Sequence, residues 1–463
     1  MTENLRCISP VDGRIFVERP YATSTEIAAA VDSAVSAQAQ WKRTSISERA
    51  DICTKAIDAF VANKDEISNG ITWQMGRPVR YGGGEVGGVE ERARHMIAIA
   101  EKALEDRPAE QKDGFTRFIR RDPLGVVFVI APWNYPYLTS INSIIPAIMA
   151  GNAVILKHSA QTPLCAEVYA DAFAAAGLPK GVFQFLHLNH ADTETLIKSP
   201  DVGFVAFTGS VPGGAMVEQA AAGRFVGVGL ELGGKDPAYV RGDADVKYAA
   251  ESLVDGAFFN SGQSCCGIER IYAHESVYDQ FIDIARDTTL AYNLGDPTNP
   301  NVTIGPLVRA SAADFVRKQT ADAIAAGARA IIPDGTFGID EPGSPYLGPQ
   351  ILVDVDHAMD VMSEESFGPV VGIMKVSSDE DAVRLMNDSA FGLTASIWTA
   401  DADAALRIGD EVSTGTWFMN RCDYLDPALA WTGVKDSGRG CTLSPLGYDH
   451  LTRPKSFHLK TQL

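Results

Sequence analysis

A cysteine and a glutamate in this sequence have neighbours that suit covalent chemistry on a carbonyl carbon. Cys265 lies in the polar, glycine-containing segment Asn260–Cys266, directly after the apolar residues Ala257-Phe258-Phe259. Glu231 precedes a Gly-Gly corner in the segment Glu231-Leu232-Gly233-Gly234-Lys235. A thiolate can add to a carbonyl carbon, and a carboxylate can activate the water that later releases the acyl group. The two segments therefore predict covalent catalysis by a thiolate, followed by hydrolysis.

Each candidate also has an ordinary structural interpretation. Cysteine is often a buried packing residue, and Glu231 could form a salt bridge with Lys235 at the end of a strand. Asn134, in Pro132-Trp133-Asn134-Tyr135-Pro136, could form a turn, although its side-chain amide also suits a developing oxyanion. Cys266 is interpreted as a small packing residue, and a disulfide or resolving partner of Cys265 is the alternative.

The composition predicts a soluble, folded chain of two or three domains. The chain has 463 residues, too many for one ordinary hydrophobic core. Hydrophobic residues make up 46% and charged residues 21%, within the range of globular proteins. The formal net charge of −19 argues against nucleic acid and anionic membranes as partners.

The sequence also predicts a cytoplasmic protein. The first ten residues contain no apolar core of a secretory signal, and the longest apolar stretches, 126–131 and 144–150, are too short to cross a bilayer. The seven cysteines are an odd number and lack C-x-x-C spacing, so neither a disulfide framework nor a metal site is expected. A nucleophilic thiol at Cys265 requires a reducing compartment.

Between residues 125 and 230, apolar β-rich runs alternate with helical patterns. The runs are 126–130, 153–156, 182–186, 202–207 and 225–230, and the helical segments lie near 138–150, 162–176, 192–198 and 213–222. This alternation predicts a parallel sheet covered by helices on both faces. Ligands of such sheets bind beyond the carboxyl ends of the strands. Asn134, Lys157 and Ser210 follow three of these runs, so we expect them to share one cleft.

The flanking regions predict scaffold helices and a second α/β region. Residues 24–107 have helical periodicity, with a capping box at Ser45-Ile46-Ser47-Glu48. After Gly234 we expect strands at 270–273, 330–332, 350–353, 370–375 and 395–399, and helices at 246–259, 276–287 and 310–326. Residues 115–121 alternate as a two-faced strand does, and the strand-like tail 452–460 is expected to pair with a neighbouring subunit.

The segment Gly82–Gly87 matches the G-x-G-x-x-G pattern of dinucleotide-binding proteins. The pattern is meaningful only where it leaves a strand and opens a helix. Here it follows residues 76–80, an expected loop, and it carries Glu85 where a pyrophosphate would need positive potential. We therefore predict that this segment does not bind a cofactor.

The sequence resembles the aldehyde dehydrogenase superfamily. Asn134 in PWNYP, Phe207-Thr208-Gly209-Ser210, Glu231 in ELGGK, Cys265 in GQSC and Glu365-Ser366-Phe367-Gly368-Pro369 occur in that family's order and spacing. The similarity extends from Ser9-Pro10-Val11-Asp12-Gly13 to the terminal strand. It implies oxidation of an aldehyde to the carboxylic acid with NAD or NADP, through a thiohemiacetal and a thioester on Cys265.

The resemblance also implies an architecture. It comprises a Rossmann-like parallel-sheet cofactor domain (residues 1–104 and 124–234), an α/β catalytic domain carrying the nucleophile (235–440), and a small β oligomerisation hairpin with the C-terminal strand (105–123 and 441–463). Such chains form homodimers or homotetramers. Two rival functions remain: a coenzyme A-acylating dehydrogenase, and a catalytically idle structural or binding protein. Glu231 favours water over coenzyme A, because acylating members typically lack this glutamate.

The resemblance assigns further roles residue by residue. Asn134 and the backbone N–H of Cys265 would hold the oxyanion. Lys157 would contact the adenosine ribose, Ser210 the pyrophosphate, Glu365 the nicotinamide ribose and Phe367 the nicotinamide ring. The complete set of expected cofactor-binding residues is Ile130, Pro132, Trp133, Lys157, Ser159, Ala160, Gly209, Ser210, Leu232, Glu365 and Phe367.

Two segments depart from the commonest family pattern. In Lys157-His158-Ser159-Ala160, the second residue is usually proline and the fourth is usually a glutamate that bonds the ribose 2′-hydroxyl and would repel a 2′-phosphate. Ala160 does neither, so we predict that NADP is accepted, with His158 as a candidate added donor. In Ala430-Trp431-Thr432-Gly433, an indole replaces a smaller ring and is expected to line the substrate tunnel.

The identity of the aldehyde is only weakly indicated. The expected substrate-pocket residues are mostly apolar or aromatic: Tyr135, Tyr137, Leu138, Phe259, Ser264, Tyr424 and Trp431. They favour an aromatic or medium-chain apolar aldehyde. Aromatic rings also surround quaternary ammonium groups, so an ammonium-bearing aldehyde is an alternative. Arg421 could instead bind the carboxylate of a semialdehyde, although a lone arginine more often forms a structural ion pair.

Overall fold

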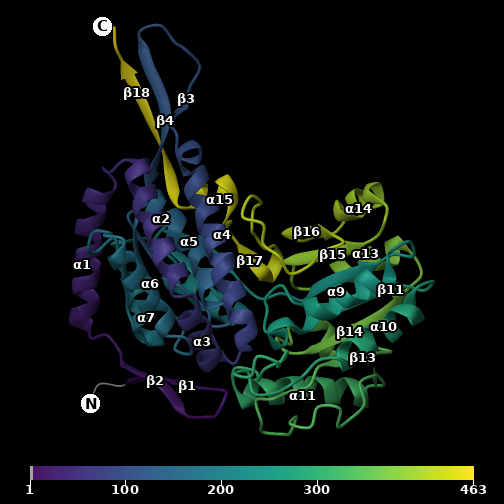
Figure 1. The fold of residues 1–463 in the computed structure, drawn as a ribbon. Helices are drawn as coiled ribbons and strands as arrows, with labels where there is room; N and C mark the ends of the chain where they lie inside the picture. The colour runs from purple at the N-terminus through teal and green to yellow at the C-terminus, as the bar shows by residue number, and fades with distance from the viewer. Residues whose placement is uncertain (1–3, 463) are drawn as a thin grey trace.

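The structure, a computed structural model, describes residues 4–462. Two open α/β sheets lie side by side, and a narrow β arm projects from the first of them (Figure 1). A short hairpin that the sequence did not predict, β1 (Asn4–Ile8) with β2 (Ile15–Pro20), precedes the first helix. The expected α/β class is confirmed.

The first sheet has the strand order β17-β9-β8-β5-β6-β7 and is parallel except for β17. Its strands are β5 (Val126–Ile130), β6 (Ala153–Lys157), β7 (Phe183–Phe185), β8 (Val202–Thr208), β9 (Gly227–Glu231) and β17 (Gly438–Arg439). The last predicted strand, residues 225–230, begins two residues before the observed β9. Phe225 is fully exposed with a φ of 55°, a left-handed conformation that a strand residue cannot adopt.

Helices cover both faces of this sheet. They are α1 (Ser24–Trp41), α2 (Ile46–Ala62), α3 (Lys64–Met75), α4 (Val79–Ala103), α5 (Pro136–Met149), α6 (Leu164–Ala175), α7 (His190–Lys198) and α8 (Val211–Ala221). Alternate residues of β5 enter different cores: Val127 and Val129 pack with α2, α5 and α6, whereas Phe128 packs with α1, α7 and α8. A strand buried on both faces must be apolar throughout, as β5 is.

The glycine-rich segment 82–87 lies inside α4, which begins at Val79. The loop that we expected at residues 76–80 therefore ends at Pro78. The glycines allow close approach of neighbouring elements. A Cβ atom on Gly82 would lie 2.7 Å from Ser68 Cα, and one on Gly88 would lie 2.7 Å from Leu138 Cδ2. Close helix packing therefore explains Gly82 and the adjacent Gly88, whereas a Cβ atom on Gly84 or Gly87 would meet nothing within 4 Å.

The second sheet has the order β12-β13-β14-β11-β10-β15-β16, parallel except for β12. Its strands are β10 (Asp236–Val240), β11 (Ile268–His274), β12 (Arg329–Ala330), β13 (Gln350–Val353), β14 (Val370–Val376), β15 (Thr394–Trp398) and β16 (Thr416–Met419). Its helices are α9 (Val246–Phe258), α10 (Tyr278–Leu290), α11 (Ala310–Ala325), α12 (Asp360–Ser363), α13 (Asp379–Asn387) and α14 (Ala402–Gly409). Two strands, β10 and β16, were not predicted. The Pro237 of β10 sits where the pairing with β11 shifts register, as prolines in sheets do.

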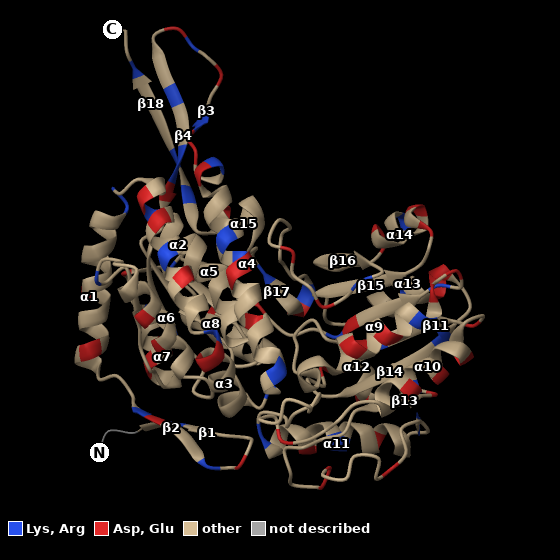
Figure 2. Cartoon of the chain, viewed as in Figure 1, with Lys and Arg blue, Asp and Glu red and all other residues tan. Residues whose placement is uncertain are grey.

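The arm contains β3 (Arg107–Pro108), β4 (Phe115–Pro123) and β18 (Thr452–Lys460), with α15 (Ser444–His450) leading into β18. The pairing of β18 with β4 runs from Thr452 opposite Pro123 to Lys460 opposite Phe115. The tail therefore pairs with β4 of its own chain on one edge, and its pairing with a neighbouring subunit stays a prediction. Basic side chains are prominent on the arm (Figure 2). No helix in residues 4–462 has the length and apolar character needed to cross a bilayer.

Candidate functional site

Two cavities meet at Cys265 and Glu231. A cleft of about 560 Å³ opens beyond the carboxyl ends of β5, β6, β8 and β9, and a second cavity of about 370 Å³ lies between α4, α5 and the segment 423–431. Cys265 and Glu231 line both, whereas Asn134 lines the larger cleft. We refer to the larger as the cofactor cleft and to the smaller as the substrate pocket. The sulfur can therefore be reached from both sides.

The nucleophile loop, residues 259–265, has a strained backbone. Asn260, Ser261 and Gly262 have φ values of 55°, 58° and 71°, and the first two are non-glycine residues for which this conformation is costly. A Cβ atom on Gly262 would lie 2.3 Å from the carbonyl oxygen of Gly368. Only glycine fits at this position, which holds the loop against the segment 365–369.

A buried ion pair between Arg77 and Glu85 fixes this loop. Arg77 Nε donates to Asn260 Oδ1 at 3.0 Å, and Arg77 Nη2 donates to the carbonyl oxygen of Asn134 at 2.5 Å. Glu85 Oε1 accepts from the backbone N–H of Tyr137 at 2.8 Å, at the amino end of α5, where a carboxylate is favoured. The pair thus joins α4, the nucleophile loop and the segment that carries Asn134.

Asn134 is buried next to the nucleophile loop. Its Nδ2 donates to the carbonyl oxygen of Gln263 at 3.2 Å, which leaves the second amide hydrogen for another acceptor. The side chain makes no turn of its own, so the turn-forming interpretation does not describe it. Cys265 is partly exposed, so the interpretation as a sealed packing thiol does not hold either.

Glu231, at the end of β9, is held by two threonine hydroxyls. Thr442 Oγ1 donates to Glu231 Oε1 at 2.6 Å and Thr208 Oγ1 donates to Glu231 Oε2 at 3.0 Å. Burial raises the pKa of the Glu231 carboxyl above its usual value, and the two threonine hydrogen bonds oppose this. The alternative salt bridge with Lys235 is wrong, because Lys235 pairs with Glu269.

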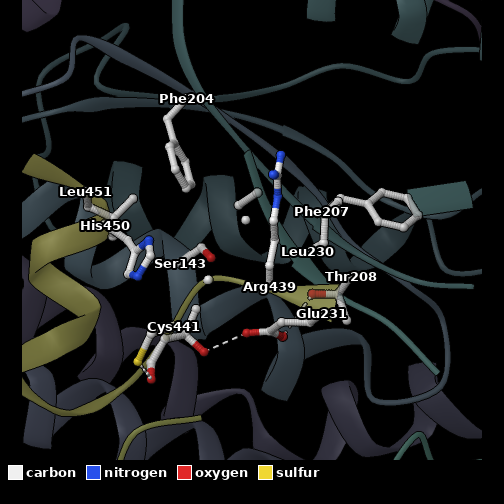
Figure 3. A pocket seen from close by; sticks show the side chains of 14 residues that line it. Ser143, Phe204, Phe207, Thr208, Leu230, Glu231, Arg439, Cys441, His450 and Leu451 are labelled. Carbon is white, nitrogen blue, oxygen red and sulfur yellow. Dashed lines mark hydrogen bonds between the residues drawn. The ribbon is translucent and has the colours of Figure 1, made fainter. Parts of the chain in front are cut away.

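A small cavity of about 20 Å³ lies behind Glu231, large enough for about one water molecule. Figure 3 shows Glu231 and Thr208 on one side of it and Ser143 and His450 on the other. The carboxylate therefore adjoins a water-sized space as well as the two larger cavities.

Nearly all the expected cofactor-binding residues line the cofactor cleft: Ile130, Pro132, Trp133, Lys157, Ser159, Gly209, Ser210, Leu232, Glu365 and Phe367. Ala160 does not line it, although it follows Ser159. Ser210 is the N-cap of α8 and accepts from the backbone N–H of Gly213 at 3.3 Å. This helix start is a favourable position for a phosphate.

The segment 365–369 is fixed by Glu269. Its carboxylate accepts from the backbone N–H groups of Ser366 at 2.8 Å and of Phe367 at 3.0 Å. Glu365 accepts from the backbone N–H of Gly234 at 3.0 Å, and burial raises its pKa to about 7. Phe367 packs edge-on against Trp133 with ring centroids 5.6 Å apart.

His158 cannot act as the added donor that the sequence suggested. Its ring is buried, its Nε2 lies 3.0 Å from the carbonyl oxygen of Pro136, and its Nδ1 accepts from the backbone N–H of Ser159 at 3.0 Å. Burial lowers its pKa to about 4. The imidazole is therefore neutral and ties the end of β6 to the start of α5.

The expected substrate-pocket residues Tyr135, Leu138, Phe259, Ser264, Tyr424 and Trp431 all line the substrate pocket. Tyr137 does not; it packs in the core against Phe60 and Tyr169. Arg421 does not line the pocket either, because it is exposed and its guanidinium stacks 3.5 Å from the centroid of the Tyr424 ring.

Sequence reasoning missed the polar part of this pocket, which comprises Arg77, Glu85, Glu91, Arg92, Asn142 and Asp423. Asp423 Oδ1 accepts from Ser264 Oγ at 3.2 Å and from Cys266 Sγ at 3.0 Å, and burial raises its pKa to about 6. Cys266 is thus hydrogen-bonded beside the nucleophile. The regular i, i+4 placement of Glu85, Val89 and Ala93 on the buried face of α4 was the only indication that this helix borders a site.

This fold and this site define an NAD(P)-dependent aldehyde dehydrogenase. The chain belongs to the aldehyde dehydrogenase family, whose model matches residues 1–457. It oxidises an aldehyde with NAD or NADP as acceptor.

Similar proteins span the whole chain. A protein of Mycobacterium bovis named succinate-semialdehyde dehydrogenase [NADP(+)] 1 is 34% identical over 442 residues, which cover 95% of this chain and 96% of that protein. The structure of a succinic semialdehyde dehydrogenase from Streptococcus pyogenes in complex with NADP+ has a TM-score of 0.93, with 27% identity, and covers 98% of this chain and 100% of that one. An NAD-dependent aldehyde dehydrogenase from Sinorhizobium meliloti has a TM-score of 0.95, with 30% identity, and covers 99% of this chain and 92% of that one.

Removing the Thr442 hydroxyl should move the acid limb of the pH–rate profile. In Thr442→Val the carboxylate of Glu231 loses a hydrogen bond that favours its ionised form, so its already raised pKa rises further. With Glu231 as the general base proposed below, which is active only when deprotonated, the fall in kcat on acidification should shift to higher pH, by about one unit. A kcat–pH profile measures this; a shift to lower pH, or none, would exclude Glu231 as the titrating base.

Proposed function

We propose that the chain is a non-acylating aldehyde dehydrogenase in which Cys265 is the nucleophile, Glu231 the general base and Asn134 an oxyanion donor. One observation carries the proposal: Cys265 and Glu231 line both cavities. An aldehyde in the substrate pocket and a nicotinamide in the cofactor cleft can thus reach the same sulfur from opposite sides. The intact triad argues against a catalytically idle member, and Glu231 argues against coenzyme A as acyl acceptor.

In the proposed reaction, Cys265 Sγ adds to the aldehyde carbon, and the oxygen becomes an oxyanion. The free amide hydrogen of Asn134 and the backbone N–H of Cys265 donate to this oxygen. The bound nicotinamide cofactor supplies the hydride acceptor. Glu231 then takes a proton from water, which attacks the thioester carbon and releases the acid and the Cys265 thiolate. The hydroxyls of Thr208 and Thr442 orient Glu231 for this step.

The residues of the cofactor cleft fit a dinucleotide. Lys157 forms no ion pair with any carboxylate in residues 4–462, so its ammonium is available to ribose or phosphate oxygens. Ser210 and the start of α8 suit the pyrophosphate, Glu365 the nicotinamide ribose, and Phe367 the nicotinamide ring. The remaining expected residues provide the walls.

We propose that NADP is accepted and preferred. Lys157 and Ser159 both line the cleft, and Ala160 contributes no carboxylate next to them. A ribose 2′-phosphate at this place would meet an ammonium and a hydroxyl without an opposing negative charge. The neutral, buried His158 adds nothing to this binding.

The chain is proposed to work in the cytoplasm as a homodimer or homotetramer. All seven cysteines are free thiols, which suits a reducing compartment. The arm is an open three-stranded sheet with exposed apolar side chains at Ile119 on the central strand β4 and Leu459 on the edge strand β18, and the open edge of β18 suits pairing with another copy. Light scattering of the purified chain checks the assembly, and a monomer at all concentrations would contradict it.

Succinic semialdehyde, which occurs in the names of two similar proteins, is the first aldehyde to assay.

Rapid-mixing kinetics test the assigned roles. Glu231→Gln should still give a first burst of reduced cofactor, because the base acts after this point, while the steady-state rate falls by about a hundredfold or more. Cys265→Ala should abolish both. Glu101→Gln, at an exposed position of α4 outside both cavities, is the matched control and should stay within about twofold. If Glu231→Gln lowered the burst amplitude and the steady-state rate equally, the proposal that Glu231 acts after hydride transfer would be wrong. Acid formation in the absence of coenzyme A excludes the acylating rival.

Steady-state kinetics with both cofactors test the NADP proposal. Ala160→Glu should lower kcat/KM for NADP by about tenfold or more, because like charges then oppose each other, while NAD is affected less. Ala160→Gln has the same size without the charge and should leave the preference nearly unchanged. A wild-type ratio that favours NAD by more than about a hundredfold would overturn the proposal.

A further inference from the structure

Arg92 is a buried guanidinium in the wall of the substrate pocket that has no carboxylate partner. It projects from α4, its side chain is only 8% exposed, and it lines the pocket. Its Nη1 donates to the carbonyl oxygen of Leu138 at 2.8 Å and to Asn142 Oδ1 at 3.2 Å. Across residues 4–462, no carboxylate oxygen lies within 4.0 Å of its nitrogens.

The remaining donors of Arg92, a residue of the pocket lining, have no acceptor among the described residues. Neither Nε nor Nη2 donates to any described residue, and neither is among the buried polar atoms that are sealed without a partner. Arginine can only donate, so the amide oxygen of Asn142 must face it, which turns Asn142 Nδ2 away. That amide nitrogen also has no described acceptor, and Asn142 lines the same pocket. Arg92 and Asn142 together form a donor cluster.

The nearby negative groups are already engaged. Glu85 pairs with Arg77, Glu231 accepts from two threonines, and Asp423 accepts from Ser264 and Cys266. Glu91, the remaining carboxylate of the pocket lining, accepts from the Tyr424 hydroxyl at 2.8 Å. Arg92 has two neutral acceptors but no counter-ion, and a buried charge without a counter-ion costs several kcal/mol. The unused donors of the cluster therefore need an acceptor that is not part of the protein. The space that the cluster borders is the substrate pocket.

We infer that the Arg92–Asn142 cluster binds a carboxylate of the substrate, so that the aldehyde is a short semialdehyde. This deepens the proposed function and rests on it. A guanidinium fork matches the two oxygens and the single charge of a carboxylate. Asp423 lies beside the nucleophile loop, where its negative charge disfavours a second carboxylate. The anion is thereby directed to Arg92, and the aldehyde carbon is left for Cys265.

This inference replaces two expectations from the sequence. The pocket is lined by aromatic and apolar side chains as expected, but its donor cluster disfavours a purely apolar aldehyde, which would leave the guanidinium unpaired. A quaternary ammonium substrate would place two cations in one pocket. Arg421, the arginine proposed from the sequence as a carboxylate clamp, is outside the pocket.

The test compares succinic semialdehyde with butanal, which has the same four-carbon chain without the carboxylate. Wild type should have a higher kcat/KM for succinic semialdehyde. Arg92→Met should lower this value by about a hundredfold, as loss of one partner of a buried charge pair does, and should leave butanal within about threefold. Arg92→Lys should recover part of the loss, and Arg421→Met, on the exposed arginine, should change neither substrate.

Binding of the product analogue succinate gives a readout that does not need turnover. Succinate should raise the melting temperature of wild type and of Cys265→Ala, but not of Arg92→Met. Equal loss of both aldehydes in Arg92→Met, or a wild-type preference for butanal, would overturn the inference, and so would succinate stabilisation that survives in Arg92→Met. If no aldehyde is oxidised while Arg92-dependent succinate binding remains, the proposed function fails and the anion site stands.

Discussion

The buried pair between Arg77 and Glu85 is the contact on which the geometry of the site depends. It connects α4 to the nucleophile loop through Asn260, and to the Asn134 segment and the start of α5 through backbone groups. Removing one partner of such a pair leaves an uncompensated buried charge, which costs about 3–5 kcal/mol. The same pair supports the left-handed residues Asn260 and Ser261, whose strain persists only because the surroundings determine it. A salt bridge in the wall of the substrate pocket thus fixes the positions of Asn134 and of the nucleophile loop.

The cofactor cleft and the substrate pocket are lined by largely different parts of the chain. The cofactor cleft is formed by strand ends and a helix start of the first sheet, together with residues of α11 and of the segment 365–369. The substrate pocket is formed by α4, α5, the nucleophile loop and the segment 423–431, and it combines charged groups with an aromatic lining. The two linings share only Thr208, Glu231 and Cys265. Such a division lets the aldehyde-binding walls change without disturbing the dinucleotide site.

The sequence predicted the first sheet and most residues that line the two cavities well, because continuous apolar runs and short motifs carry that information locally. It missed β10, since Pro237 argues against a central strand, and it misplaced the glycine-rich segment, since helix packing against Ser68 and Leu138 is a tertiary property. Arg92 was also missed. A charged residue on a helix is usually solvated, and only the packed structure shows that this one is buried beside Asn142 without a counter-ion.

The strand β18 pairs with β4 from the opposite end of the chain, and β17 completes the edge of the first sheet beside Glu231. Thr442, which holds the base, lies between these two late strands. During synthesis, the amino-terminal half must therefore leave the ribosome with an unfinished sheet edge and with Glu231 held by the Thr208 hydroxyl alone. The edge strand and the second hydroxyl arrive only with the last few dozen residues, so a polypeptide from an interrupted translation would contain Cys265, Glu231 and Asn134 and still lack one of the two hydroxyls that hold the carboxylate.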